Sequence, residues 1–203
     1  MGRVVAAVGH DRRRMVRLVI VSGAPGAGKT TLARLLAAEL AMPLIVRDDI
    51  KEALMDALGC DSLERSTELG RGSYAAMYAV LRELLRSGAG AIVETNFRRG
   101  TSESELRPFV EQSDAVLVHC ESADIRVRFL NRARHPGHLG QAVAERLMRE
   151  LNAGLFEPIE LGIPTLRVDC SDSYRPPLRD VVAFVGQPRR ERFGGTTTPK
   201  KDA

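Results

Sequence analysis

Apolar residues along the chain follow two kinds of pattern. Short runs rich in Val, Ile and Leu predict strands covered on both faces, whereas apolar residues at intervals of three and four predict amphipathic helices. The predicted strands are Val16–Ser22, Leu44–Arg47, Ala91–Thr95, Ala115–Cys120 and Thr165–Cys170. The predicted helices are Lys29–Leu40, Ile50–Leu58, one long or two stacked helices over Leu63–Arg86, Ser104–Gln112, Ala123–Arg134, Gln141–Leu155 and Leu178–Val185.

This alternation predicts an α/β fold with a five-stranded parallel sheet and helices on both faces, although it does not give the strand order. We expect one domain over residues 15–185. It is preceded by a flexible basic leader (1–14) and followed by a tail (186–203) whose Gly, Thr, Pro and Lys content predicts disorder. Gly70–Tyr74 is predicted to interrupt the long helical stretch.

The net charge of +4 is concentrated at the two ends of the chain. Residues 1–14 and 186–203 each carry +3, which leaves −2 for the body. Binding to a nucleic-acid backbone needs a broad positive surface, so a small-molecule partner is favoured over nucleic acid. No apolar run approaches the roughly 20 residues that span a bilayer. Together with three widely separated cysteines, this predicts a cytoplasmic protein without disulfides.

The strongest motif is Gly23-Ala24-Pro25-Gly26-Ala27-Gly28-Lys29-Thr30, a complete G-x-x-x-x-G-K-[ST] sequence between a predicted strand and a predicted helix. Such a phosphate-binding loop (P-loop) surrounds phosphates with backbone N–H groups at a helix N-terminus. It predicts a three-layer P-loop NTPase fold with ATP and Mg²⁺ as cofactors. Lys29 is expected to reach the β- and γ-phosphates, Thr30 to ligate Mg²⁺, and the residues from Gly23 to Thr31 to contact the nucleotide.

Acidic residues follow the second predicted strand. Phosphoryl transfer to a hydroxyl needs a carboxylate that accepts the proton, and Asp48 is placed for that role. Asp49 and Glu52 fit a helix capping box, which is the simpler interpretation of Asp49. Lys51 either holds an anionic acceptor or lies on a solvated helix face.

The third predicted strand ends in Glu94, Thr95 and Asn96. Glu94 could hold the Mg²⁺ shell, as the acid after an apolar strand does in a Walker B site, or it could orient the acceptor with Thr95 and Asn96. The alternative is a strand that turns into solvent through Arg98 and Arg99. From their position alone, Arg71, Ser73 and Tyr74 are expected to line the acceptor pocket.

The segments G-A-P-G-A-G-K-T-T, R-D-D-I-K and E-T-N-F resemble the P-loop kinase group that contains polynucleotide 5′-kinases, zeta toxins, small antibiotic or sugar kinases and many AAA-family ATPases. The resemblance implies that Asp48 is the catalytic base and that Lys51 contacts the acceptor. In the polynucleotide kinases this position is usually arginine, and a lysine cannot make the same bidentate contact.

The group also carries a mobile lid with arginines after its fourth strand, which corresponds here to about residues 126–141. Arg128 and Arg132 share a helical face and are expected to neutralise charge on the γ-phosphate, while Arg134 is expected to contact the nucleotide. The alternative for each arginine is a solvated helix face. His135 and His138 have no third ligand at suitable spacing, so a turn is favoured over a zinc site.

The leading hypothesis is a kinase that moves the γ-phosphate of Mg-ATP to a hydroxyl of a small-molecule or nucleic-acid acceptor. The alternative is an ATP-hydrolysing switch or assembly protein without an acceptor. A toxin with an antitoxin-like partner is a special case of the first hypothesis, and no residue supports it.

Overall fold

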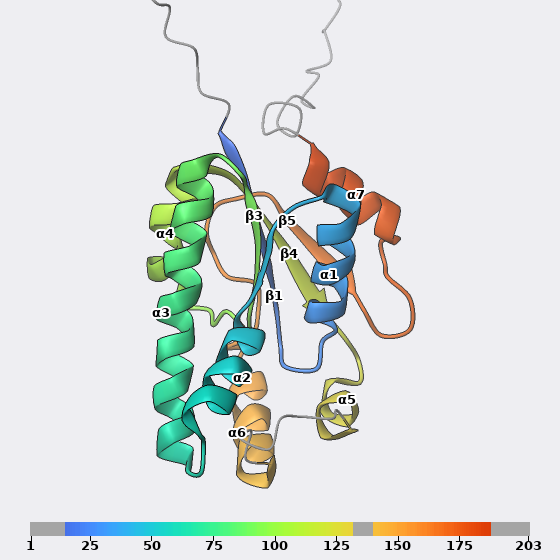
Figure 1. Ribbon diagram of the computed structural model, residues 1–203. Helices are drawn as coiled ribbons and strands as arrows, with labels where there is room; N and C mark the ends of the chain where they lie inside the picture. Colours follow the sequence, from blue (N-terminus) through green and yellow to red (C-terminus); the bar gives the residue numbers. More distant parts are fainter. Residues whose placement is uncertain (1–14, 132–139, 188–203) are drawn as a thin grey trace, which may run out of the picture.

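The computed structural model describes residues 15–131 and 140–187. Within these ranges one parallel sheet has the strand order β2-β3-β1-β4-β5, and helices lie on both of its faces (Figure 1). The strands are β1 (Val16–Gly23), β2 (Leu44–Val46), β3 (Ala91–Glu94), β4 (Ser113–Glu121) and β5 (Thr165–Asp169). The helices are α1 (Lys29–Leu40), α2 (Arg47–Leu58), α3 (Leu63–Ser87), α4 (Ser102–Glu111), α5 (Ile125–Asn131), α6 (Gly140–Asn152) and α7 (Leu178–Gly186). The predicted fold class is confirmed.

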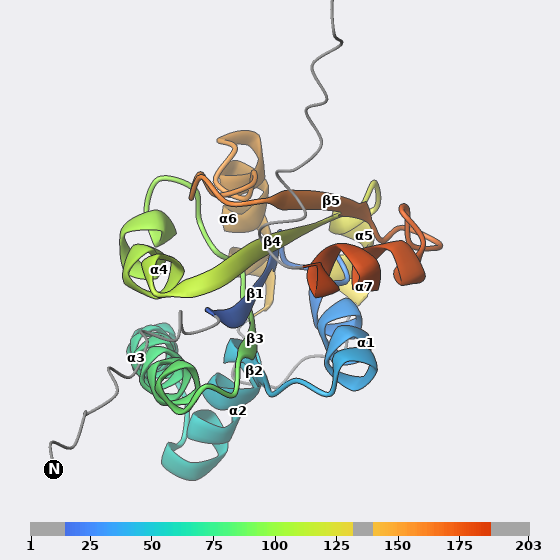
Figure 2. The ribbon, with the colours of Figure 1, turned by 90° about the horizontal axis from the view of Figure 1, so that it is seen from above.

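The central strand β1 explains the layered arrangement. Its residues from Leu18 to Val21 are completely buried, and successive side chains point to opposite faces of the sheet. Val19 and Val21 belong to a core cluster with Leu32 and Leu36 of α1 and with Val181 of α7. Helices α1 and α7 therefore cover one face of the sheet, while α3 and α4 cover the other (Figure 2).

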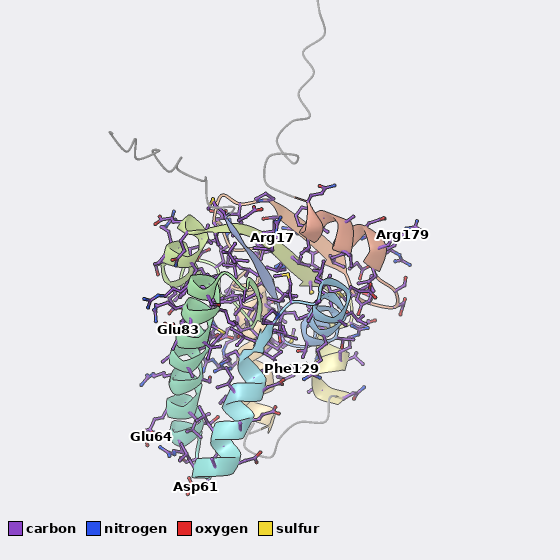
Figure 3. The ribbon with its side chains drawn as sticks, turned by 45° about the horizontal axis from the view of Figure 1, so that its top comes forward. Arg17, Asp61, Glu64, Glu83, Phe129 and Arg179 are labelled. Atoms are coloured by element: carbon purple, nitrogen blue, oxygen red, sulfur yellow. The ribbon has the colours of Figure 1, made fainter. Side chains whose placement is uncertain are left out.

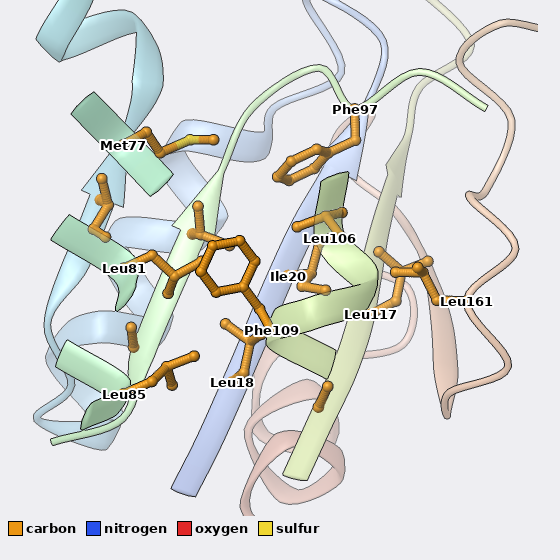
Figure 4. Packing of buried hydrophobic residues seen from close by; sticks show 14 of the residues in the cluster. Leu18, Ile20, Met77, Leu81, Leu85, Phe97, Leu106, Phe109, Leu117 and Leu161 are labelled. Atoms are coloured by element: carbon orange, nitrogen blue, oxygen red, sulfur yellow. The ribbon is translucent and has the colours of Figure 1, made fainter. Parts of the chain in front are cut away.

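On the second face, Leu18 and Ile20 pack against residues of α3 and α4 (Figure 4). Helix α3 contributes Met77, Leu81 and Leu85, which recur at intervals of four and so lie on one side of the helix. This apolar side fixes α3 across the sheet.

The predicted interruption of the long helical stretch is wrong, because α3 continues through Gly70–Tyr74. A glycine in a helix costs about 1 kcal/mol relative to alanine, and the burial of the apolar side of α3 offsets that cost. Gly70 has a packing role: a Cβ atom there would lie 3.0 Å from Nη2 of Arg47. Its missing side chain lets α2 approach α3.

Helix α2 begins at Arg47, three residues before the predicted start, so Asp48 and Asp49 lie in its first turn. The N-cap residue is Val46, and no side chain caps the helix. The capping-box interpretation of Asp49 is therefore wrong. Its carboxylate instead pairs with Arg34 of α1 at 3.0 Å, and negative charge near a helix N-terminus is favourable in any case.

Helices α2, α5 and α6 lie near the carboxyl ends of the strands (Figure 1). The connection between α2 and α3, marked by Asp61 and Glu64, lies far from the sheet (Figure 3). Ala24, Phe129, Leu147 and Phe156 form a small apolar cluster that joins the P-loop to α5 and α6. Helices α5 and α6 are thus packed on the P-loop beyond the strand ends.

The structure describes only a small part of the predicted leader and tail. The predicted leader (1–14) lies outside the described residues, as does nearly all of the predicted tail (186–203). Gly186, the first residue of that tail, is the last residue of α7. None of the helices in the described ranges combines the length and apolar character needed to cross a bilayer.

Candidate active site

The P-loop connects β1 directly to α1. Gly23 pairs in register with Cys120 of β4, and a Cβ atom at Gly23 would lie 2.2 Å from the Cys120 carbonyl oxygen. Gly28 is the N-cap of α1 with φ 87°, a left-handed conformation that glycine adopts without strain. These two glycines let the chain turn tightly, so that the loop lies at the positive end of α1.

Lys29 is the first residue of α1, and 5% of it is exposed. Its ammonium donates a hydrogen bond to the Ala24 carbonyl oxygen at 2.8 Å, within the same loop. It also lies 3.9 Å from a carboxylate oxygen of Glu94. Lys29 is thus held at the loop, with Glu94 from β3 beside it. Thr31 lies in the first turn of α1 with its side chain exposed.

Glu94 also accepts a hydrogen bond from the hydroxyl of Thr30 at 3.1 Å. The contact joins residues 64 positions apart, because β3 lies next to β1 in the sheet. A hydroxyl and a carboxylate are hard oxygen ligands, and Mg²⁺ typically takes one or two protein oxygens together with water and substrate phosphates. Thr30 and Glu94 therefore fit an Mg²⁺ site beside the P-loop.

Asp48 lies in the first turn of α2. Its carboxylate accepts a hydrogen bond from Arg47 at 3.0 Å, and 28% of its side chain is exposed. Arg47 also donates to the Gly70 carbonyl oxygen at 3.2 Å, and its guanidinium lies 4.6 Å from the centre of the Tyr74 ring. Asp48 is thus held in place by an arginine that α3 itself orients.

Lys51 does not lie on a solvated helix face, because only 9% of the residue is exposed. Its ammonium donates a hydrogen bond to the hydroxyl of Ser66 on α3 at 2.9 Å. Burial, followed by the positive charge of Arg47, lowers the pKa of Lys51. The lysine stands one helical turn after Asp48 and points between α2 and α3.

A cavity of about 870 Å³ opens between α2, α3, the segment after β3, and the helices α5 and α6. Pro25 of the P-loop forms part of its wall, together with Lys51, Arg71, Tyr74 and Asn96. Half of the eight predicted acceptor residues therefore lie around one cavity that reaches the P-loop, and Asp48 and Glu94 are not among its lining residues. Ser73 does not line it, because its fully buried hydroxyl donates to the Gly70 carbonyl oxygen.

Thr95 lies behind the cavity wall. It is 3% exposed, and its hydroxyl is 3.3 Å from the hydroxyl of Tyr74. Thr95 thus contacts Tyr74, and Tyr74 lines the cavity.

Arg98 does not simply turn into solvent. It lines the cavity and binds the carboxylate of Glu150 on α6 through two hydrogen bonds of 2.8 and 2.9 Å. Arg146 donates to the same carboxylate at 2.7 Å. Arg146 and Glu150 were not among the predicted site residues, although their spacing of four on a predicted helix indicates a pair that shares one face.

The predicted lid residues are only partly within the described ranges. Arg128 on α5 donates hydrogen bonds to the carbonyl oxygens of Cys170 and Ser171, after β5. Its guanidinium also lies close to Gly28, since a Cβ atom there would be 3.6 Å from Nη1 of Arg128. Arg128 is thus placed beside the P-loop, bound to the segment after β5. Arg132, Arg134, His135 and His138 lie outside the described residues.

The sequence matches the AAA domain family over residues 18–154, which include the P-loop, Asp48, Glu94 and α5. The chain belongs to this family. Uncharacterized proteins of Mycobacterium tuberculosis (strain H37Rv) and Mycobacterium bovis are 35% identical to it over 83 residues, or 41% of the chain. The match spans 17% of the length of those mycobacterial proteins.

Solved structures share the fold over most of the chain. A candidate kinase from Chloroflexus aurantiacus is 29% identical, with a TM-score of 0.74 over 86% of this chain and 98% of that one. A gluconokinase from Sinorhizobium meliloti is 17% identical, with a TM-score of 0.56 over 91% of this chain and all of that one. Kti12 from Chaetomium thermophilum, solved with ADP-AlF3, is 17% identical, with a TM-score of 0.57 over 84% of this chain and all of that one. The predicted membership of the P-loop kinase group is confirmed.

Proposed function

We propose that the chain is a phosphotransferase that moves the γ-phosphate of ATP to a hydroxyl of a small molecule. The observation that carries this proposal is that the P-loop forms part of the wall of a cavity of about 870 Å³. Pockets of this size hold small-molecule ligands. A switch that only hydrolyses ATP needs a place for water and does not need such a cavity.

In this proposal the P-loop and Lys29 bind the phosphates of ATP. The ammonium of Lys29 exchanges the Ala24 carbonyl and Glu94 for phosphate oxygens, and the backbone at the start of α1 contributes its N–H groups. Thr30 and Glu94 hold Mg²⁺, which when bound supplies positive charge that offsets the charge of the transferring phosphoryl group. Arg128, with the predicted lid residues Arg132 and Arg134, completes the nucleotide side.

Asp48 is the proposed general base. It accepts the proton of the acceptor hydroxyl while the acceptor oxygen forms a bond to the γ-phosphorus, and the bond from that phosphorus to the bridging oxygen of ADP breaks. Arg47 holds the carboxylate at 3.0 Å, and this contact orients the base. The acceptor side is formed by Lys51, Arg71 and Asn96, which line the cavity. Thr95 contributes indirectly, because its hydroxyl contacts that of the lining residue Tyr74.

Two observations favour a small acceptor over nucleic acid. Residues 1–14 and 186–203 carry the excess positive charge, and residues 15–185 carry a net charge of −2. The gluconokinase that shares the fold is named for a small hydroxy acid. No observation on the described residues supports an antitoxin-like partner.

The test uses γ-labelled ATP and Mg²⁺ with pools of sugars, sugar acids, nucleosides, aminoglycosides and 5′-hydroxyl oligonucleotides. Wild type is expected to label one small-molecule pool, and Asp48→Asn to lower the rate by about 10²- to 10⁴-fold, the usual contribution of a general base. Asp49→Asn is the matched control, because Asp49 is the exposed neighbouring acid and pairs only with α1 among the described elements. Release of free phosphate alone, at equal rates in wild type and Asp48→Asn, would refute the proposal.

A further inference from the structure

The cavity beside the P-loop is rich in positive charge. Five cationic side chains line it against two carboxylates, those of Glu105 and Glu150. Both carboxylates already have partners: Glu150 binds Arg98 and Arg146, and Glu105 accepts a hydrogen bond from Tyr78 at 2.8 Å. The remaining cations are Arg47, Lys51 and Arg71.

Lys51 is the most unusual of these three. Among the described residues its ammonium has the hydroxyl of Ser66 as a hydrogen-bond partner and no carboxylate within ion-pair distance. Buried charges in proteins are normally paired, because an uncompensated charge loses its hydration. The carboxylate of Asp48, one turn away, is bound by Arg47 and offsets only part of the cost, since the pKa of Lys51 remains lowered by burial.

Arg71 extends the same positive surface on α3. It lines the cavity, and within the described ranges it forms no ion pair. The preceding residue is Gly70, where a Cβ atom would lie 3.9 Å from Nζ of Lys51. Lys51 on α2 and Arg71 on α3 therefore present positive charge to the cavity from neighbouring helices, and in the described ranges neither forms an ion pair with a carboxylate.

We propose that the acceptor carries an oxyanion, a carboxylate or a phosphate, which Lys51 and Arg71 bind while Asp48 faces the hydroxyl that is phosphorylated. This inference rests on the proposed function and narrows its acceptor to anionic hydroxy compounds. Asp48 and Lys51 are three residues apart on α2, which places their Cβ atoms about 5–6 Å apart. One small molecule can reach both, with its oxyanion only a few bonds from its reacting hydroxyl.

The first test measures binding without catalysis. The protein is saturated with Mg-ADP, which occupies the P-loop, and is titrated by calorimetry with gluconate, glucose 6-phosphate and the neutral polyol glucitol. At least one of the two anions is expected to bind, and glucitol is expected to bind at least tenfold more weakly. Lys51→Met and Arg71→Gln are each expected to weaken anion binding about tenfold or more, which is the effect of losing a charge-assisted hydrogen bond. Preference for gluconate identifies a carboxylate acceptor, and preference for glucose 6-phosphate a phosphate acceptor.

The matched control is Arg86→Gln, which removes an arginine of α3 that is exposed and does not line the cavity. It is expected to leave anion binding unchanged. Failure of both anions to bind wild type, or equal binding by wild type and Lys51→Met, would overturn the proposal.

A second measurement separates a ligand-binding lysine from a lysine that stabilises the fold. If Lys51 is retained for the ligand, the free Lys51→Met protein should unfold at the same or a higher temperature than wild type, because the substitution removes a buried charge. A lower midpoint would mark Lys51 as a structural residue and would overturn the proposal.

The labelled-transfer assay separates this inference from the proposed function. Transfer of label to neutral acceptors at a rate that Lys51→Met does not change would keep the kinase and reject the oxyanion site. Anion binding that depends on Lys51, without transfer to any acceptor pool, would keep the oxyanion site and reject the kinase.

Discussion

The buried pair of Lys29 and Glu94 allows a quantitative prediction about the free protein. Both side chains are 5% exposed, and 3.9 Å separates the ammonium nitrogen from the nearer carboxylate oxygen. We consider Lys29→Met, Glu94→Gln and the double variant. Each single variant removes one charge and leaves the other in a site with little access to water.

The expected magnitude follows from the distance. At 3.9 Å and an effective dielectric constant of about 20, the attraction between two unit charges is about 4 kcal/mol. Breaking a buried pair by removing one partner typically costs about 3–5 kcal/mol, whereas replacing both partners is often close to neutral. Each single variant should therefore lose about 4 kcal/mol of unfolding free energy, or about 10 °C in midpoint for a chain of this size. The double variant should lose less than either.

Urea unfolding of the four proteins without nucleotide gives the coupling energy directly. The exposed pair of Arg34 and Asp49, whose side chains are 61% and 56% exposed, is the matched control cycle. Its coupling should be about 0–1 kcal/mol, as is usual for a surface ion pair. Additive losses at Lys29 and Glu94, or single variants within 1 kcal/mol of wild type, would show that the pair does not hold the free P-loop as described.

Three further predictions concern other parts of the structure. Burial lowers the pKa of His119 to about 4, whereas its pKa in the unfolded chain is about 6.5. Between these two pH values the unfolded chain is protonated at His119 and the folded chain is not, so the free energy of unfolding decreases as the pH falls. Relative to His119→Asn, wild type should lose about 3 kcal/mol of stability between about pH 7 and pH 4 in urea titrations, and parallel curves would contradict this. Gly28→Ala should abolish ATP binding in calorimetry while the protein stays folded. The reason is that φ at this position is 87° and the new Cβ atom would lie 3.0 Å from Cβ of Cys170. Retained affinity for ATP would refute this loop geometry. Glu150→Gln should lower the unfolding free energy by about 2 kcal/mol, because it weakens the charge-assisted hydrogen bonds from Arg98 and Arg146. Glu160→Gln on the surface should change the unfolding free energy by less than about 0.5 kcal/mol. Equal effects of the two substitutions would contradict this role of Glu150.

The elements with complete patterns could be predicted from the sequence alone. The strand β1 is a largely apolar run, and α1 follows a P-loop whose glycines fix the turn. For these two elements the local sequence pattern therefore predicts the same structure that burial in the core favours. The start of α2 was missed because no side chain caps it, which leaves no local signal at Val46. The continuity of α3 was missed because Gly70 normally weakens a helix, and its contact with α2 becomes evident only in three dimensions.

The candidate site shows the same division. The P-loop motif predicted the neighbourhood of Lys29 and Thr30, but the approach of Glu94 depends on β3 lying beside β1, and the strand order does not follow from periodicity. The burial of Lys51 depends on how α3 packs against α2, so its charge alone suggested two opposite roles. The contacts of Arg128 with carbonyl oxygens after β5 join residues about forty positions apart, which helical spacing cannot indicate.

Phosphoryl transfer to an acceptor is tested most directly by the ratio of phosphorylated acceptor formed to ATP consumed, measured in one reaction with the acceptor pool that takes up label. A phosphotransferase with Asp48 as its base predicts a ratio near one for wild type and for Asp49→Asn, and a loss of acceptor phosphorylation in Asp48→Asn. A ratio near zero in wild type with every pool, with ATP converted to ADP and free phosphate at a rate that Asp48→Asn leaves unchanged, would contradict the account.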